Sequence, residues 1–149
     1  MRSKKALPPV YLFFAIVAMF LLHFFAPLAI VVVYPWLLLG CVPLLLGITL
    51  NLSADRAFKK YNTTVKPFKQ STTLITTGVF RITRHPMYLG MILILTGLAF
   101  FMGSVTPFFV IPVFAILIEK IFVKAEEKML ADTFCNNWVD YCSKVRKWI

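Results

Sequence analysis

Charged side chains are scarce in this sequence and are missing altogether from two long stretches. Only 15% of the 149 residues are Lys, Arg, Asp or Glu, whereas 60% are hydrophobic and the mean hydropathy is +0.82. Soluble globular domains contain about 25% charged and about 45–50% apolar residues. No charged residue occurs from Val10 to Leu52 or from Pro86 to Ile118. This composition excludes an ordinary soluble domain and indicates a protein of the lipid bilayer.

The residue types that build disulfides, metal centres and soluble nucleotide folds are also few. The three cysteines, Cys41, Cys135 and Cys142, are odd in number and include no Cys-x-x-Cys pair. This argues against a disulfide framework and, because there are only two histidines, against a metal site. No Gly-x-Gly-x-x-Gly motif is present, which excludes a soluble Rossmann-type domain. No small-residue cleavage site follows a short apolar region, so a secretory signal peptide is a poor interpretation.

Each of the two uncharged stretches is long enough for two membrane-spanning helices. A single helix over the first stretch, at about 1.5 Å per residue, would be roughly twice as long as the hydrocarbon core is thick. Pro27 and Pro35 mark the expected turn, and Gly103, Ser104 and Pro107 divide the second stretch. We therefore predict an all-α polytopic membrane protein, a single domain over 1–149, with four transmembrane helices near 10–31, 34–53, 86–103 and 106–123.

The basic residues predict the orientation of the chain. All 16 Lys and Arg residues lie before the first predicted span, between the second and third, or after the fourth. With four spans these regions share one side of the membrane, and the positive-inside rule makes that side the cytoplasm. Both termini are thus expected to be cytoplasmic, at the inner membrane if the protein is bacterial. Orientation and contact with anionic membrane lipids account for the net charge of +10, so no nucleic-acid partner is predicted.

Function is expected in a cytoplasmic loop over 54–85 and in a C-terminal region over 120–149. Pro86 suits the first turn of a helix, so the third span is predicted to begin there. The N–H groups that follow, at Met87 to Gly90, then lie beside Arg84 and His85 and form an anion-binding arrangement. Gly90 either allows a neighbouring helix to approach or leaves space for a ligand, and packing is the favoured interpretation.

The C-terminal region adds an acidic pair and an amphipathic helix. Adjacent acids such as Glu126 and Glu127 are usually solvated and paired with nearby lysines. Close to an anion-binding helix start, however, they would make a site of both signs that suits a zwitterion. The apolar face of the helix is expected to lie on the membrane interface or to pack against the loop, and it carries Phe134, Trp138, Tyr141 and Val145 at spacings of four, three and four.

Taken together, these features resemble the integral-membrane methyltransferases of the isoprenylcysteine carboxyl methyltransferase and phospholipid methyltransferase superfamily. The residues that carry the resemblance are Arg84-His85-Pro86-Met87-Tyr88-Leu89-Gly90, Glu126-Glu127 and the aromatic tail that ends at Trp148-Ile149. The resemblance implies S-adenosylmethionine as methyl donor, bound at the cytoplasmic face by residues 72–149. It also implies a hydrophobic acceptor that arrives from the bilayer: an isoprenylated cysteine carboxylate, an ethanolamine lipid, or a small hydrophobic thiol or amine.

The resemblance further implies a set of cofactor-binding residues, namely Thr72, Thr73, Leu74, Ile75, Phe80, His85, Pro86, Met87, Tyr88, Gly90, Glu126 and Glu127. Arg84, His85, Tyr88 and Glu127 are the predicted catalytic residues. We expect Arg84 and the helix start to hold the cofactor carboxylate and one of the two glutamates to bind its ammonium. The chain departs from the family pattern at Phe80, where a Tyr is commoner, and in the tail, with Cys135 for Gly, Trp138 for Tyr and Arg146-Lys147 for Pro-Arg.

Two alternatives to a methyltransferase remain open from the residues alone. One is a small four-helix transporter or scaffold, although His23 is the only ionisable side chain deep in a predicted span. A histidine satisfied by a neighbouring helix is the favoured role for His23. The other alternative is an NADPH-dependent membrane reductase with a similar C-terminal architecture. The oligomeric state is not predicted, but close helix contacts are permitted by Gly40, Gly47, Gly90 and Gly97.

Overall fold

The computed structural model describes residues 7–62 and 73–149, and within these ranges the regular structure is helical, with no named strand. The predicted cofactor residue Thr72 lies outside the described residues. The elements are α1 (Pro8–Phe25), η1 (Trp36–Gly40), α2 (Cys41–Lys60), η2 (Gly78–Arg81), α3 (Pro86–Met102), α4 (Thr106–Ile118), the π-helical η3 (Glu119–Val123) and α5 (Lys124–Lys144). The predicted all-helical fold class is confirmed for this part of the chain.

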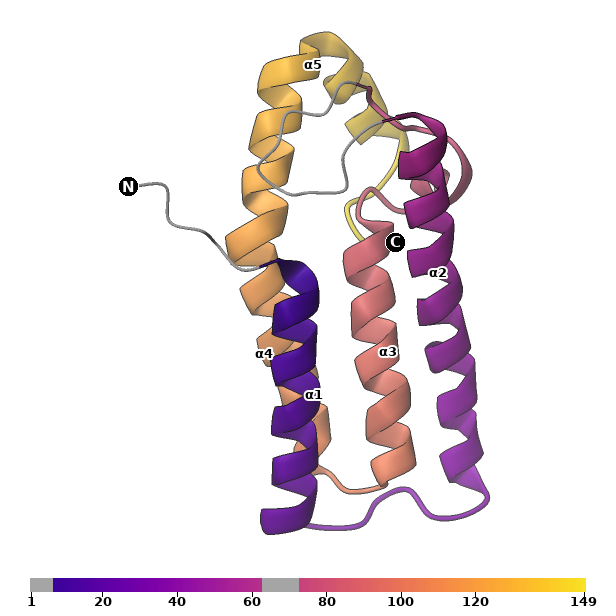
Figure 1. Cartoon of the computed structure of the whole chain (residues 1–149), viewed down its shortest axis with the longest axis vertical. Helices are drawn as coiled ribbons and strands as arrows, with labels where there is room; N and C mark the ends of the chain where they lie inside the picture. Colours follow the sequence, from indigo (N-terminus) through magenta and orange to yellow (C-terminus); the bar gives the residue numbers. More distant parts are fainter. Residues whose placement is uncertain (1–6, 63–72) are drawn as a thin grey trace.

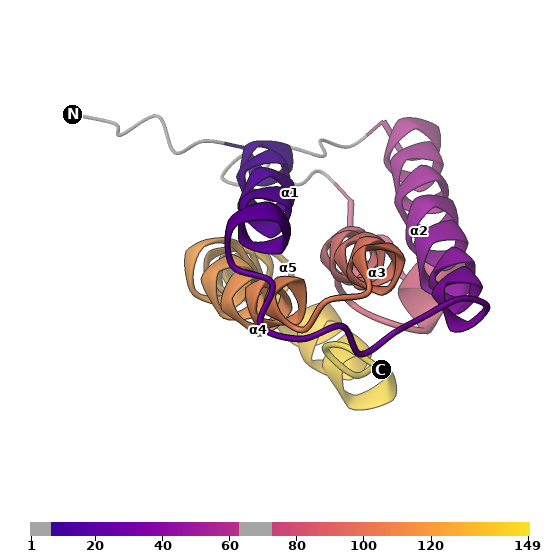
Figure 2. The same cartoon turned by 90° about the horizontal axis from the view of Figure 1, so that it is seen from below.

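The long helices run alongside one another, and α4 continues through η3 into α5 (Figure 1). Seen from below, α3 lies between α2 on one side and the pair of α1 and α4 on the other (Figure 2). The connections over 26–35 and 103–105 lie at one end of the molecule, and η2 and the bent part of α5 lie at the other. The two functional segments expected from the sequence therefore meet at the same end.

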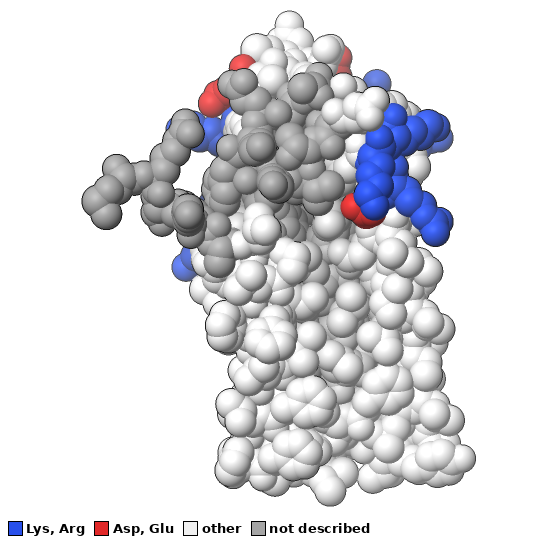
Figure 3. All heavy atoms as spheres, viewed as in Figure 1, with Lys and Arg blue, Asp and Glu red and all other residues white. Residues whose placement is uncertain are grey.

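Among the residues that the structure describes, two stretches of helix are long and apolar enough to cross a membrane: α1, and the 25 residues of η1 and α2, each with an 18-residue window whose mean hydropathy is 2.0. Helix α3 is apolar but has 17 residues. The coloured charged side chains gather toward one end, and the white surface toward the other end shows none (Figure 3). The apolar helices and this separation of charge indicate membrane association, whereas four complete spans go beyond what the helix lengths establish.

Helix α3 packs closely against η1 and α2 because glycines face one another at two levels. A Cβ atom on Gly90 would lie 2.8 Å from the carbonyl oxygen of Gly47, and one on Gly97 would lie 2.7 Å from the carbonyl oxygen of Gly40. Real side chains do not tolerate such distances, so each glycine permits the approach of the two backbones. The close helix contact predicted from these glycines is confirmed.

The first helix ends six residues earlier than the sequence pattern indicated, at Phe25. Pro27 disfavours continuation of the helix, because it lacks an N–H group and restricts the backbone of the residue before it. The chain after it instead bonds to the connection between α3 and α4: Val31 and Val32 both donate to the carbonyl oxygen of Gly103, at 2.8 and 3.0 Å. At the same end, His23 Nδ1 lies 2.7 Å from the hydroxyl of buried Ser104, so this histidine has a polar partner from a neighbouring segment.

Helix α5 bends back over the loop that precedes α3. The bend occurs at Cys135, whose φ of 45° and ψ of −115° are non-helical. Beyond it, Trp138, Tyr141 and Val145 form a buried cluster, against which Leu74 packs. The predicted amphipathic face is confirmed, and of its two expected partners it contacts the loop.

Candidate active site

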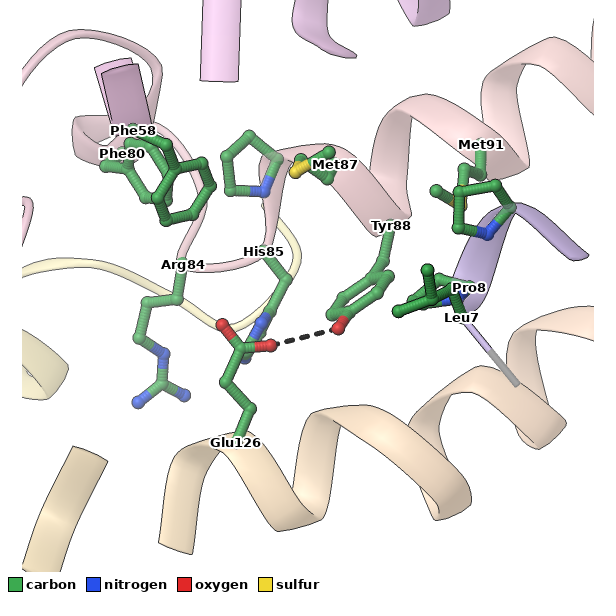
Figure 4. Close-up of a pocket in the computed structure, with 12 residues that line it drawn as sticks. Leu7, Pro8, Phe58, Phe80, Arg84, His85, Met87, Tyr88, Met91 and Glu126 are labelled. Atoms are coloured by element: carbon green, nitrogen blue, oxygen red, sulfur yellow. Dashed lines mark hydrogen bonds between the residues drawn. The ribbon is translucent and has the colours of Figure 1, made fainter. Parts of the chain in front are cut away.

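A cavity of about 230 Å³ lies at the charged end of the helices, between the starts of α1 and α3, the end of α2, η2 and α5 (Figure 4). It is lined by Leu7, Pro8, Pro9, Phe58, Phe80, Arg84, His85, Pro86, Met87, Tyr88, Met91 and Glu126. A narrower cleft of about 30 Å³ adjoins it, sharing Phe58, Phe80, Arg84 and Glu126. The rest of the cleft is lined by Thr73, Leu74, Ile75, Leu130, Trp138 and Tyr141.

One wall of the cavity is the first turn of α3. His85 precedes a proline and is held out of the helical region, at φ −125° and ψ 59°, so that the helix begins at Pro86 as predicted. The carbonyl oxygen of His85 accepts the first hydrogen bond of the helix, from the N–H of Leu89 at 3.0 Å. Pro86, Met87 and Tyr88 line the cavity. The positive end of the α3 dipole therefore lies at its edge.

Glu126 on α5 faces this helix start. Its Oε2 accepts a hydrogen bond of 3.0 Å from the Tyr88 hydroxyl, as Figure 4 shows. The Tyr88 ring stacks on that of Phe122, with ring centroids 6.3 Å apart and planes 29° apart. Phe122 belongs to the π-helical segment and is fully buried. The core thus holds Tyr88, and Tyr88 holds the Glu126 carboxylate at the cavity wall.

Glu127 has different surroundings and lines neither of the two cavities described above. Its Oε1 lies 3.3 Å from both Arg84 Nη2 and His85 Nε2, and its Oε2 lies 3.1 Å from Lys147 Nζ. Burial on its own would raise the pKa of Glu127, but hydrogen bonds from His85 and Lys147, together with the charges of His85 and Arg84, lower it to about 2. Glu127 is therefore the ionised centre of a cluster that it forms with Arg84, His85 and Lys147.

Arg84 connects that cluster to the cavities, because it lines both of them. Besides Glu127, its guanidinium contacts Cys142 Sγ and lies over the Trp138 ring, 5.6 Å from the centroid. Its Nε is buried and has no hydrogen-bond partner among the residues that the structure describes. A buried N–H group without a partner is costly, so this atom marks a place where an acceptor from a ligand would be stabilising.

The C-terminal tail fixes the loop that carries Arg84. The buried Thr83 hydroxyl donates to the carbonyl oxygen of Lys147 at 3.0 Å and accepts from the His85 N–H at 3.2 Å. The Tyr141 hydroxyl donates to the carbonyl oxygen of Phe80 at 2.6 Å. Sequence reasoning missed Thr83 and Lys147 as site residues. No spacing signals their contact, because they are 64 residues apart and meet through one backbone carbonyl.

The structure brings most of the residues predicted for the site together. Those at the larger cavity are Phe80, Arg84, His85, Pro86, Met87, Tyr88 and Glu126. Thr73, Leu74 and Ile75 line the narrower cleft. Glu127 lies behind Arg84 in the ionic cluster, and Gly90 lies against Gly47 of α2, outside both cavities. The close approach of Gly90 to Gly47 agrees with the interpretation that Gly90 serves helix packing. A contact between Gly90 and a cofactor stays a prediction.

Comparison with known proteins gives a family match and a fold match. The profile of the phospholipid methyltransferase family matches residues 35–137. No curated protein sequence matches the chain. A solved structure with a similar fold is that of a eukaryotic intramembrane Ras methyltransferase, isoprenylcysteine carboxyl methyltransferase, with a TM-score of 0.68 and 23% identity. The superposition covers all of this chain and 53% of that one, so this chain spans about half of that protein's length.

Proposed function

The chain belongs to the phospholipid methyltransferase family of membrane methyltransferases, and we propose that it transfers a methyl group from S-adenosylmethionine to a hydrophobic or lipid-like acceptor at the cytoplasmic membrane face. The observation that carries this proposal is the cavity between α3 and α5. It is mainly apolar, yet Arg84 and Glu126 present opposite charges at its wall. The transporter, scaffold and reductase alternatives are not favoured by the family match.

The residues present fit such a cofactor. Arg84, whose Nε has no partner among the described residues, lines both cavities and has N–H donors for a carboxylate, and Glu126 at the cavity wall can accept from an ammonium group. Phe58 and Phe80 pack edge to face at 5.5 Å between the two cavities and offer apolar surface to an adenosine group. The larger cavity, with the cleft beside it, approaches the lower end of the range of about 300–1,000 Å³ that is usual for small-molecule sites.

The methyl transfer requires mainly that the donor and the acceptor are aligned. S-adenosylmethionine supplies a methyl group on a positively charged sulfur, and that sulfur departs as a neutral thioether. The chain must hold the acceptor in line with the methyl group and exclude water. Such positioning can lower the activation free energy by about 7–11 kcal/mol. Tyr88 and Glu126 form the polar wall, while Leu7, Pro8 and Met91 provide apolar surface at the end of the cavity beside Tyr88.

The acceptor decides whether a base is needed. A carboxylate acceptor is already ionised at neutral pH, so it requires none. An amine or a thiol must lose a proton, and His85, Tyr88 and Glu126, which line the cavity, are the candidates for removing it. The apolar end of the cavity favours an acceptor with a hydrophobic or lipid-like tail that arrives from the membrane.

The proposal includes the membrane arrangement. We place four spans across the bilayer: α1, η1 with α2, α3, and α4 with η3. The last two have 17 and 18 residues, the lower end of the lengths that cross a hydrocarbon core. Both termini are then cytoplasmic, at the inner membrane if the protein is bacterial, and the chain forms one domain whose cofactor-binding region is 72–149.

Thermal unfolding of the purified protein with S-adenosylhomocysteine tests the proposal. At a concentration 100 times its Kd, this product should stabilise the fold by about 2.7 kcal/mol, whereas NADPH should not raise the unfolding temperature. Protection by NADPH alone would point to a reductase, and protection by neither compound would contradict the proposed activity. Mass spectrometry of membrane extracts incubated with labelled S-adenosylmethionine would then identify the acceptor.

A further inference from the structure

Lys147 lies between two carboxylates at the junction of α4 and α5. Its Nζ is 3.1 Å from Glu127 Oε2 and 3.3 Å from Glu119 Oε1, and 29% of its side chain is exposed. Lys147 lines neither of the two cavities described above. It therefore joins the ionic cluster through the Glu127 oxygen that Arg84 does not contact, without lining either cavity.

The two carboxylate oxygens of Glu127 have different cationic or polar partners. Oε1 faces Arg84 and His85, and Oε2 faces Lys147. If Oε2 lost its cation, the guanidinium of Arg84 would be the nearest group able to bind both oxygens, because a guanidinium pairs with a carboxylate in a fork. Arg84 would then be drawn toward Glu127 and away from the cavity wall that it lines.

We propose that Lys147 is a positioning residue. Its charge offsets that of Glu127 at the oxygen that Arg84 does not contact, so that the Arg84 guanidinium stays available to bind the anionic group of the ligand. The inference rests on the proposed function, since it takes the carboxylate of the cofactor as that anionic group. It assigns a role to a residue in the tail, where the chain departs from the pattern of the methyltransferases it resembles.

Lys147 is suited to this role over a wide range of pH. Burial on its own would lower the pKa of Lys147, but hydrogen bonds to Glu127 and Glu119 raise it above the ordinary 10.5. The side chain is therefore charged at physiological pH. Its charge is also separable from its backbone contact, because Thr83 binds the carbonyl oxygen of Lys147, which every substitution retains.

A double-mutant cycle tests the inference. Lys147→Met removes the charge with little change in length, Lys147→Arg keeps it, and Lys144→Met is the matched control at an exposed lysine of the same tail. We expect Lys147→Met to weaken S-adenosylhomocysteine binding about tenfold or more by calorimetry, Lys147→Arg to recover most of that loss, and the control to bind as the wild type does. In a Glu127→Gln background, Lys147→Met should have little further effect.

The ligand-free protein provides a second readout. Lys147→Met should lower the unfolding temperature of the wild type more than that of the Glu127→Gln variant, because only the former contains the ion pair. Equal effects of Lys147→Met in the two backgrounds, in affinity or in unfolding temperature, would overturn the inference. A wild-type protein that does not bind S-adenosylhomocysteine would overturn the proposed function, while the unfolding cycle would still decide whether Lys147 and Glu127 are coupled.

Discussion

Glu126 and Glu127 are neighbours in the sequence with different partners, so the same substitution should have different effects at the two positions. Glu126 lines both cavities and accepts one hydrogen bond, from Tyr88. Glu127 lines neither and pairs with Arg84, His85 and Lys147. We expect Glu126→Gln to reduce cofactor binding and Glu127→Gln chiefly to reduce stability.

The magnitudes follow from these partners. A glutamine at 126 keeps a carbonyl oxygen for the Tyr88 hydroxyl but loses the charge that faces the ligand. A hydrogen bond to a charged group contributes about 1.5–3 kcal/mol, so the Kd for S-adenosylhomocysteine should rise about 10- to 150-fold. A glutamine at 127 leaves partly buried cations without their counterion. A cost of about 1–3 kcal/mol would lower the unfolding temperature by about 2–12 °C.

Calorimetry with S-adenosylhomocysteine and thermal unfolding of the ligand-free protein measure the two effects separately. Asp132→Asn is the matched control, because it makes the same acid-to-amide change at an exposed position of α5 outside both cavities. If Glu126→Gln binds as tightly as the wild type does, Glu126 does not hold the ammonium group. If instead Glu127→Gln unfolds normally but does not bind, the two roles are exchanged and the assignment is wrong.

Three further predictions concern packing, the bend in α5 and pH. Gly90→Ala should cost about 1–3 kcal/mol of stability in denaturation experiments, because its methyl group would meet the backbone oxygen of Gly47. Cys135→Gly should raise the unfolding temperature, because a positive φ costs other residues about 1–3 kcal/mol and glycine little; an unchanged or lower value would argue against strain at the bend. The pKa of Glu127 is lowered, so its contribution to stability is present above pH 4.5 and should be lost as the pH falls toward 2. Lys147, whose pKa is raised, should lose its contribution only as the pH rises above 10.5, and unfolding temperatures measured against pH, compared with Glu127→Gln and Lys147→Met, check both signs.

Much of the fold follows from local signals. Uncharged runs and prolines indicate helices, and Pro86 marks a helix start because its missing N–H group costs nothing there. The glycines of α2 and α3 indicate a close contact because only small residues let two helix backbones approach. The early end of α1 was not predicted, since the bonds from Val31 and Val32 to Gly103 depend on a connection more than 70 residues away.

Most residues of the site could be predicted from the sequence, but the directions in which their side chains face could not. Consecutive residues of a helix point about 100° apart, so only one of two adjacent glutamates can face the cavity fully. The π-helical turn at Glu119–Val123 changes the phase of the helix just before that pair, and a sequence pattern based on regular helices cannot tell which glutamate faces inward. The contact between Thr83 and Lys147 could not be predicted from residue types, because its acceptor is a backbone carbonyl oxygen, which every residue has.

The bend at Cys135 explains why the tail and the loop before α3 form one site. A straight α5 would carry Trp138 and Tyr141 away from the other helices, whereas the bent helix returns them to the loop (Figure 1). Tyr141 then binds the carbonyl oxygen of Phe80, and Trp138 lies against the guanidinium of Arg84. The family pattern that this chain resembles has glycine at the position of Cys135, and the positive φ found there is one that glycine adopts more easily than other residues do. The departure at Cys135 therefore preserves the bend at some cost in strain, because the bend brings Trp138 to Arg84 and Tyr141 to Phe80 at the wall of the proposed cofactor site.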